Sequence, residues 1–251
     1  MFVKPSPPDS PGVLASLRQF WRERAERAGK LAATREVMLA LGEFLRDSTP
    51  SRLRLRFGDA DYDWDHRVNT TSGAVGWRDR LIGQFHSAYQ PTEPSSFGEM
   101  LQALQGIAHI DLAQFSFLDL GSGKGRTLLM ASDYPFRRII GVELLPNLDA
   151  IAKRNLAAYK SDSQQCFSFE SVCADATTYP LPGGPLLVYL FNPLPEWGLR
   201  KVLGNLSQSW QRDPRPLYVL YHNPVLEHVL GEATFLNKIA LSDQYSIYGV
   251  V

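Results

Sequence analysis

One aspartate and three glycines at alternate positions form the first group of residues that could do chemistry. Asp119, Gly121, Gly123 and Gly125 follow directly on an apolar run. Glycine tolerates positive φ and lets the backbone approach a ligand without a Cβ in the way. A helix that begins after such a turn presents unpaired N–H groups to the ligand. The pattern therefore predicts a nucleotide-sized binding site where a buried strand turns into a helix.

A second candidate site residue closes the next apolar run. Residues 138–143 have the pattern of a short strand that ends in Glu143. At this place in a doubly wound sheet, a carboxylate accepts hydrogen bonds from ribose hydroxyls. The glycine turn and the acid together predict a nucleoside ligand. The structural alternative is a glycine turn that only shapes the junction between strand and helix.

Two other nucleotide-binding motifs fit the glycine loop poorly. A P-loop, GxxxxGK[ST], requires glycine where the chain has Leu118 and serine or threonine where it has Gly125. A dinucleotide fingerprint, GxGxxG, requires its third glycine where the chain has Arg126. The sequence therefore disfavours phosphate-cradling and nicotinamide ligands.

The loop Asp-x-Gly-x-Gly-x-Gly resembles the first motif of class I S-adenosylmethionine (SAM) methyltransferases, and Glu143 is similar to the ribose-binding acid of that superfamily. The resemblance implies SAM as the cofactor and methyl transfer as the activity. It also implies an adenine contact from Asp175 and the backbone of Ala176, for which a turn or helix cap is the alternative. The loop residues that it places at the cofactor are Asp119, Gly121, Ser122, Gly123 and Gly125.

Asn192 and Pro193 follow the fourth predicted strand of this region. They resemble the Asn/Asp-Pro-Pro-aromatic motif of amide- and adenine-modifying methyltransferases, whose side-chain oxygen grips the target amino group. The resemblance implies that Asn192 is a catalytic residue in contact with both cofactor and acceptor. Leu194 and Pro195 replace the second proline and the aromatic, so nucleobase methylation is disfavoured. The alternative is that Asn192 only begins a turn.

Tyr89 and Thr92 match a Tyr-x-x-Thr loop. They resemble the loop that covers the methionine end of SAM in seven-strand, non-SET histone lysine methyltransferases, and the run 89–193 resembles bacterial class I enzymes of uncertain substrate. The resemblance implies that both residues bind the cofactor and that Tyr89 is catalytic; a core tyrosine and a helix cap are the alternative. The candidates for receiving the acceptor's proton are Tyr89, Glu93, Asn192, Tyr221 and His222.

From residue 115 onward, apolar runs alternate with helical patterns, which predicts an α/β fold. We expect a doubly wound, mostly parallel seven-stranded sheet with an antiparallel C-terminal hairpin strand, preceded by a helical N-terminal segment. The predicted strands are at about 115–120, 138–143, 167–173, 185–191, 216–222, 233–241 and 244–250, with helices at about 124–133, 147–159 and 196–210. Residues 86–251 form the predicted SAM-binding domain.

The N-terminal third is expected to be less regular. Residues 1–12 contain four prolines and are predicted to be a disordered lead-in. Residues 13–85 form a helical segment on the substrate side, with two helices over 13–46. Residues 58–66 alternate acids with mostly aromatic residues, which predicts an alternating strand or an extended segment. A calcium loop beginning at Asp59 is disfavoured because Trp64 and Thr70 occupy its required glycine and glutamate positions. Whether 59–66 contacts the substrate is left open.

The composition of the chain limits the kinds of partner that we expect it to bind. The chain has 251 residues, is 44% hydrophobic and carries 26 basic and 26 acidic side chains, so it has no bulk attraction to nucleic acid or an anionic membrane. Cys166 and Cys173 provide neither a disulfide framework nor a CxxC zinc pair. No stretch has the apolar length of a signal peptide or a membrane span, so we expect a cytoplasmic protein. Because the sequence has neither a zinc pair nor a complete calcium loop, we predict no metal site.

The sequence predicts a SAM-dependent methyltransferase that modifies a nitrogen or oxygen of an unidentified acceptor, either a protein side chain or a small molecule. One alternative is a regulatory protein that binds SAM without turnover. The other is a nicotinamide-dependent oxidoreductase, which is disfavoured because Arg126 stands where the dinucleotide motif requires its third glycine. The acceptor and the oligomeric state are left open.

Overall fold

The computed structural model describes residues 13–47, 60–71 and 91–250. The predictions for residues 1–12 and for Tyr89 lie outside these ranges. The helices are α1 (Val13–Ala28), α2 (Lys30–Asp47), α4 (Ala60–His66), α6 (Pro94–Ala108), the 3-10 turn η2 (Leu112–Gln114), α7 (Arg126–Ser132), α8 (Pro146–Ala158), α9 (Glu196–Arg212) and α10 (Glu227–Gly231). The strands are β1 (Ser116–Leu120), β2 (Arg138–Glu143), β3 (Phe169–Cys173), β4 (Leu186–Leu190), β5 (Leu217–His222), β6 (Leu236–Leu241) and β7 (Tyr245–Val250).

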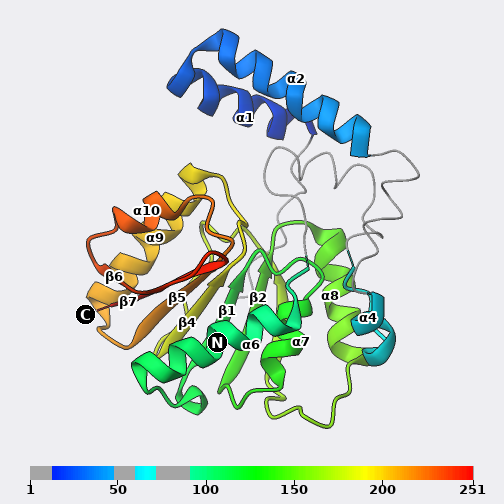
Figure 1. Cartoon of the computed structure of the whole chain (residues 1–251), viewed down its shortest axis with the longest axis vertical. Helices are drawn as coiled ribbons and strands as arrows, with labels where there is room; N and C mark the ends of the chain where they lie inside the picture. The colour runs from blue at the N-terminus through cyan, green and yellow to red at the C-terminus, as the bar shows by residue number, and fades with distance from the viewer. Residues whose placement is uncertain (1–12, 48–59, 72–90, 251) are drawn as a thin grey trace.

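The strands form a single seven-stranded sheet in the order β3-β2-β1-β4-β5-β7-β6 (Figure 1). Strands β1 to β5 are parallel, and β7 runs antiparallel to both of its neighbours. Strands β1 and β4 are buried along their whole length, as expected for the middle of a sheet covered on both faces. The predicted fold class is confirmed, and this is the sheet that the resemblance to class I methyltransferases implies.

Helices cover both faces of the sheet. Helices α6 and α7 pack with Phe117 and Tyr189 on one face, and Leu156 of α8 joins the same cluster. Helices α9 and α10 pack on the opposite face, against residues such as Leu118 and Val188. Because successive strand residues point to opposite faces, β1 contributes to both cores. This arrangement leaves the strand ends free to carry the loops of the candidate site.

Most predicted elements are confirmed to within a few residues, and two need correction. The predicted strand over 58–66 is wrong, because residues 60–66 form helix α4. Tyr62 and His66 stack at 4.4 Å, while Trp64 is 85% exposed. The last hairpin begins at Leu236 and not near residue 233, since a turn in which Leu236 N donates to Ala233 O precedes it.

The N-terminal helices α1 and α2 form the predicted helical pair, at the top of Figure 1. Trp21 Nε1 donates to Thr34 Oγ1 across the pair. Arg27 lies 2.7 Å from Glu196 at the first turn of α9, so α1 contacts the N-terminal end of the helix that follows β4. In the part of the chain that the structure describes, no helix has the length and apolar character needed to cross a membrane.

Candidate functional site

The loop after β1 has the backbone that its glycines predict. Gly121, Gly123 and Gly125 have φ of 86°, 54° and 82°, all in the left-handed region. Gly121 also has no room for a side chain, because a Cβ there would lie 2.3 Å from Pro193 Cβ. The loops after β1 and β4 are therefore in direct contact. They meet where strand order reverses, which is the place where open α/β sheets bind ligands.

Glu143 lies at the end of β2, and its carboxylate is fixed by the backbone of two loops. Gly123 N donates to Oε2 at 2.8 Å, and Leu145 N donates to Oε1 at 2.7 Å. Burial raises the pKa of Glu143 to about 7, although these two backbone hydrogen bonds oppose the shift. Each carboxylate oxygen has a second lone pair. The acid can thus hold the glycine loop and still accept from a ligand.

Asp119 is the second buried carboxylate of the site. Burial is the largest cause that raises the pKa of Asp119 well above its usual value, and the negative charge of Glu143 raises it further. A hydrogen bond with the Thr127 side chain acts in the opposite direction. A cation placed against this pair would lower both pKa values and favour the charged carboxylates. Without such a cation, burial shifts both groups towards their neutral forms.

Ser122 is buried in the glycine loop, and its Oγ has no hydrogen-bond partner among the residues that the structure describes. A buried unpaired hydroxyl is uncommon in folded proteins and indicates an additional partner. The side chain lies over Gly141 of β2, where an added Cβ would come within 2.6 Å of Ser122 Oγ. Gly141 therefore makes room for the loop, a role for which the sequence carries no local signal.

Asp175 and Ala176 follow β3, and both are partly exposed. Asp175 Oδ1 accepts from Thr177 N at 2.8 Å, so one carboxylate oxygen forms the turn that was the structural alternative. Ala174 N donates to Glu143 O, which joins this turn to the end of β2. The adenine contact implied for Asp175 and Ala176 stays a prediction.

Asn192 adopts the left-handed conformation with φ of 46°, which asparagine tolerates better than most residues. Its Oδ1 accepts from the Tyr221 hydroxyl at 2.8 Å, and its Nδ2 donates to Asn223 O at 2.6 Å. The side chain thus links the loop after β4 to the end of β5. The structure brings together two of the predicted acceptor-side residues, Asn192 and Tyr221.

A buried hydrogen-bonded chain joins three further residues. Thr92 Oγ1 lies 2.8 Å from the Tyr189 hydroxyl, which lies 2.9 Å from His222 Nδ1. Burial lowers the pKa of His222 to about 4, so the imidazole is neutral near pH 7. Tyr189 is the fourth of the five residues of β4 and was not among the sequence candidates, since its run is uniformly apolar. The Thr92 side chain is directed into the core, whereas Glu93 is exposed at the start of α6.

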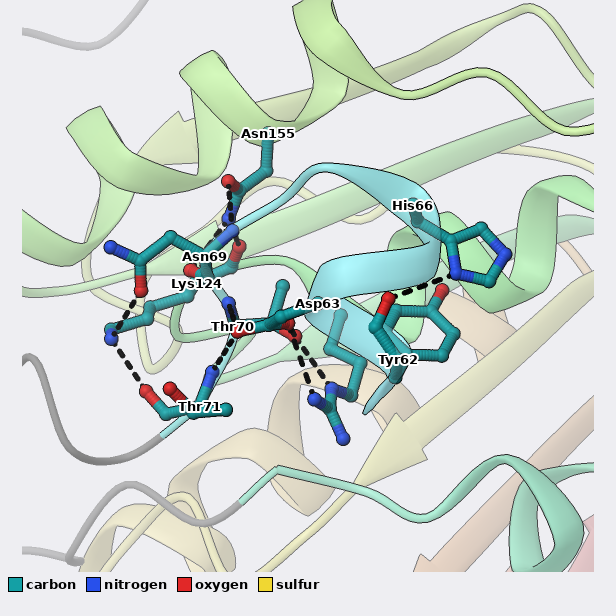
Figure 2. A network of polar contacts seen from close by, with 9 residues as sticks. Tyr62, Asp63, His66, Asn69, Thr70, Thr71, Lys124 and Asn155 are labelled. Carbon is teal, nitrogen blue, oxygen red and sulfur yellow. Dashed lines mark hydrogen bonds and ion pairs between the residues drawn. The ribbon is translucent and has the colours of Figure 1, made fainter. Parts of the chain in front are cut away.

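Lys124 and Arg126, next to the last loop glycine, are buried, and both contact residues 62–71. Figure 2 shows the contacts of Lys124. Lys124 Nζ donates to Thr71 O, and Arg126 Nε donates to Thr70 Oγ1. In the sequence, Arg126 only excludes the dinucleotide motif, and Lys124 gives no signal of its own. Their partners are at least 53 residues away in the sequence, so no local pattern indicates them. Among the described residues, no group of three or more His, Cys, Asp or Glu is placed to hold a metal ion.

No protein-family model matches the chain, and no curated protein is found to be similar. Solved structures that match include a ribosomal protein L11 methylase from Lactobacillus delbrueckii subsp. bulgaricus, with 13% identity, a TM-score of 0.42, and coverage of 62% of this chain and 78% of that chain. The N-methyltransferase NodS from Bradyrhizobium japonicum has 10% identity and a TM-score of 0.43, covering 62% of this chain and 92% of its own. A TehB-like SAM-dependent methyltransferase from Corynebacterium glutamicum has 16% identity and a TM-score of 0.40, and the match covers 63% of this chain and 99% of that chain. The assignment of the fold rests on the strand order of the chain itself.

Proposed function

We propose that the protein is a SAM-dependent methyltransferase that modifies a nitrogen or oxygen atom of its acceptor. The observation that carries this proposal is the hydrogen bond between Gly123 N and Glu143, which joins a left-handed glycine loop to an acid at the end of the adjacent strand. This pairing positions a carboxylate for ribose hydroxyls beside a backbone that has no side chains in the way.

The buried groups of the site fit SAM. Glu143 would accept from the ribose hydroxyls, and the unpaired Ser122 hydroxyl would gain a partner. Asp119 and Glu143 are buried carboxyl groups with raised pKa values, and a sulfonium compound with a net positive charge would favour their charged forms. Asp175 Oδ2 and the backbone of Ala176 would contact the adenine. When bound, SAM supplies an activated methyl group whose leaving group needs no proton.

The acceptor side is formed by the loops after β4 and β5. Tyr221 and Asn223 orient the Asn192 amide, and this orientation is the positioning role that the chemistry requires. The acceptor atom must be neutral when it attacks, and a group that receives its proton must itself be unprotonated. His222 is neutral near pH 7 because burial lowers its pKa to about 4. Tyr89 retains its proposed role at the methyl group, and the contact of α1 with Glu196 supports a substrate-side N-terminal segment.

Titration calorimetry with SAM, S-adenosylhomocysteine, NAD and ATP tests the cofactor. We expect micromolar-range binding of the first two compounds and none of the others. Tight NAD binding without SAM binding would refute the proposal in favour of an oxidoreductase.

Transfer of label from methyl-labelled SAM to a cell lysate, sorted by molecular weight, tests the activity. The expected result is one labelled class of product whose labelling rate falls by about ten- to a hundredfold with an Asn192→Ala variant. SAM binding without transfer to any lysate fraction would instead indicate a regulatory SAM-binding protein.

A further inference from the structure

We propose that residues 62–71, here called the strap, close over the cofactor loop, and that strap closure and SAM binding are thermodynamically coupled. Lys124 and Arg126 act as positioning residues in this coupling. The inference rests on the proposed function, because it assigns a regulatory contact to the same site. The strap consists of most of α4 and the turn that follows it, and it contains the acidic segment that the site residues leave unexplained.

Arg126 is the main contact between the strap and α7. Its side chain is 1% exposed, and its guanidinium lies 4.7 Å from the centre of the Tyr62 ring. Nε donates to Thr70 Oγ1 at 2.6 Å, and Nη2 lies 3.3 Å from Asp63 Oδ1. A planar guanidinium can satisfy a ring face, a hydroxyl and a carboxylate together, which a lysine cannot. Arg126 directly follows Gly125, so this contact fixes the C-terminal end of the loop.

Lys124 makes the second contact from inside the loop. Its Nζ donates to Thr71 O at 2.6 Å and to Asn69 Oδ1 at 3.1 Å (Figure 2). Burial lowers the pKa of Lys124 to about 8, and the negative charge of Asp63 opposes the shift. Lys124 follows Gly123, whose N–H is bound by Glu143. The strap is thus only one residue away from the proposed ribose-binding contact.

Asn155 of α8 binds the strap and the loop at the same time. Its Nδ2 donates to Asn69 O and to Lys124 O, both at 2.9 Å. Its Oδ1 accepts from Asn69 N, also at 2.9 Å. All the hydrogen-bonding groups of this buried side chain therefore face the strap or the loop (Figure 2). The amide would lose partners if the strap moved away.

Asp63 organises the strap itself. Its carboxylate accepts from Thr70 N at 2.7 Å and from Thr71 N at 2.9 Å, and the Thr70 hydroxyl also donates to it. The same carboxylate is the anionic partner of Arg126. One acid therefore shapes the turn that presents Thr70 and Thr71 to the two cations. Without this acid, the strap loses both its turn and its charge complementarity.

The coupling follows from these shared contacts. The residues on both sides of Gly125 are held by the strap, so an ordered loop and a closed strap favour each other. A ligand that binds only the ordered loop must then favour closure, and closure must strengthen ligand binding by the same factor. A coupling of typical size changes affinity by about 5- to 150-fold.

Hydrogen exchange measured by mass spectrometry on the full chain, with and without SAM, tests this coupling. We expect SAM to slow exchange in peptides covering residues 60–71 as well as in those covering the glycine loop. Asp63→Asn should weaken SAM binding by about tenfold and abolish the effect on the strap. Asp65→Asn is the matched control, because Asp65 is an exposed acid on the same helix, and it should change neither measurement.

Two outcomes separate the inference from the proposed function. If SAM protects the glycine loop but not the strap, and Asp63→Asn binds SAM like the wild type, the coupling is refuted and the proposed function stands. If SAM binds nowhere, both are refuted. Should Asp63→Asn fail to fold, Asn69→Ala takes its place, because it removes one Lys124 contact from an exposed position. The wild-type exchange data then still show whether SAM protects the strap. Arg126→Lys should bind SAM more weakly than the wild type, since lysine keeps the positive charge but not the planar guanidinium with its several donors.

Discussion

Replacing Glu143 by glutamine should weaken SAM binding and remove most of its pH dependence. In the wild type, two backbone N–H groups donate to different carboxylate oxygens, leaving the second lone pairs for the ribose hydroxyls. Glutamine has a single carbonyl oxygen, so one backbone N–H would face an NH₂ group. Hydrogen bonds to a charged acceptor contribute about 1.5–3 kcal/mol, which corresponds to an affinity loss of about ten- to a hundredfold at pH 8.

The pH dependence follows from the raised pKa of Glu143, about 7 in the free protein. With that pKa, the charged fraction falls from about 90% at pH 8 to about 3% at pH 5.5, so wild-type affinity should fall by up to about 30-fold. Binding near pH 7 should release protons, which calorimetry in two buffers of different ionisation enthalpy measures. The sign for folding is opposite: because the folded pKa exceeds the unfolded value of 4.5, stability from this group is lost as pH rises from about 4.5 through 7.

Glu170→Gln provides the matched control. Glu170 is a partly exposed acid on β3 that pairs with Arg138, so its loss removes the same charge outside the site. It should leave SAM affinity and its pH profile unchanged. Wild-type affinity for Glu143→Gln at pH 8, or a flat wild-type profile from pH 5.5 to 8, would refute the ribose assignment.

Three other predictions use single substitutions. Gly121→Ala should lower the free energy of unfolding by about 2–4 kcal/mol, since it combines positive φ with a clash. Its control, Gly204→Ala, lies on the open surface of a helix and should raise the free energy of unfolding by about 0.5–1 kcal/mol. Equal denaturation midpoints for the two variants would contradict this prediction. Asn192→Ala should leave SAM affinity within about twofold but lower turnover by about ten- to a hundredfold, and lost SAM binding would make this residue structural. Thr92→Val should cost about 1–2 kcal/mol of unfolding free energy by removing a partner of the buried Tyr189 hydroxyl. A parallel loss of SAM affinity would show that Thr92 also contacts the cofactor.

The fold was predictable because its strands are local apolar runs with clear ends. Strand β2 was predicted with its observed bounds, since Glu143 closes a run of buried residues. Helix α4 was mistaken for a strand because Tyr62 and His66 are four positions apart in the sequence, a spacing that puts them on one face in either structure. In a segment of this length, alternation and helical periodicity are hard to distinguish.

The candidate site was predictable only where backbone conformation dictates the residue. The loop glycines have the positive φ that their spacing indicates, and Asn192 occupies a left-handed turn. The contacts of Lys124 and Arg126 with the strap depend on side chains that meet only after folding. The same holds for Gly141, whose importance follows from the Ser122 side chain above it.

The contact between Gly121 and Pro193 has a consequence for the evolution of this protein. Pro193 fills the space that a side chain at Gly121 would need, so the two positions cannot vary independently. A homologue with a larger residue at the position of Gly121 must carry a different turn after β4, and an alignment should show the two positions covarying. Under the proposed function, changing the acceptor through the Asn192–Pro193 turn therefore requires the glycine loop after β1 to be redesigned with it.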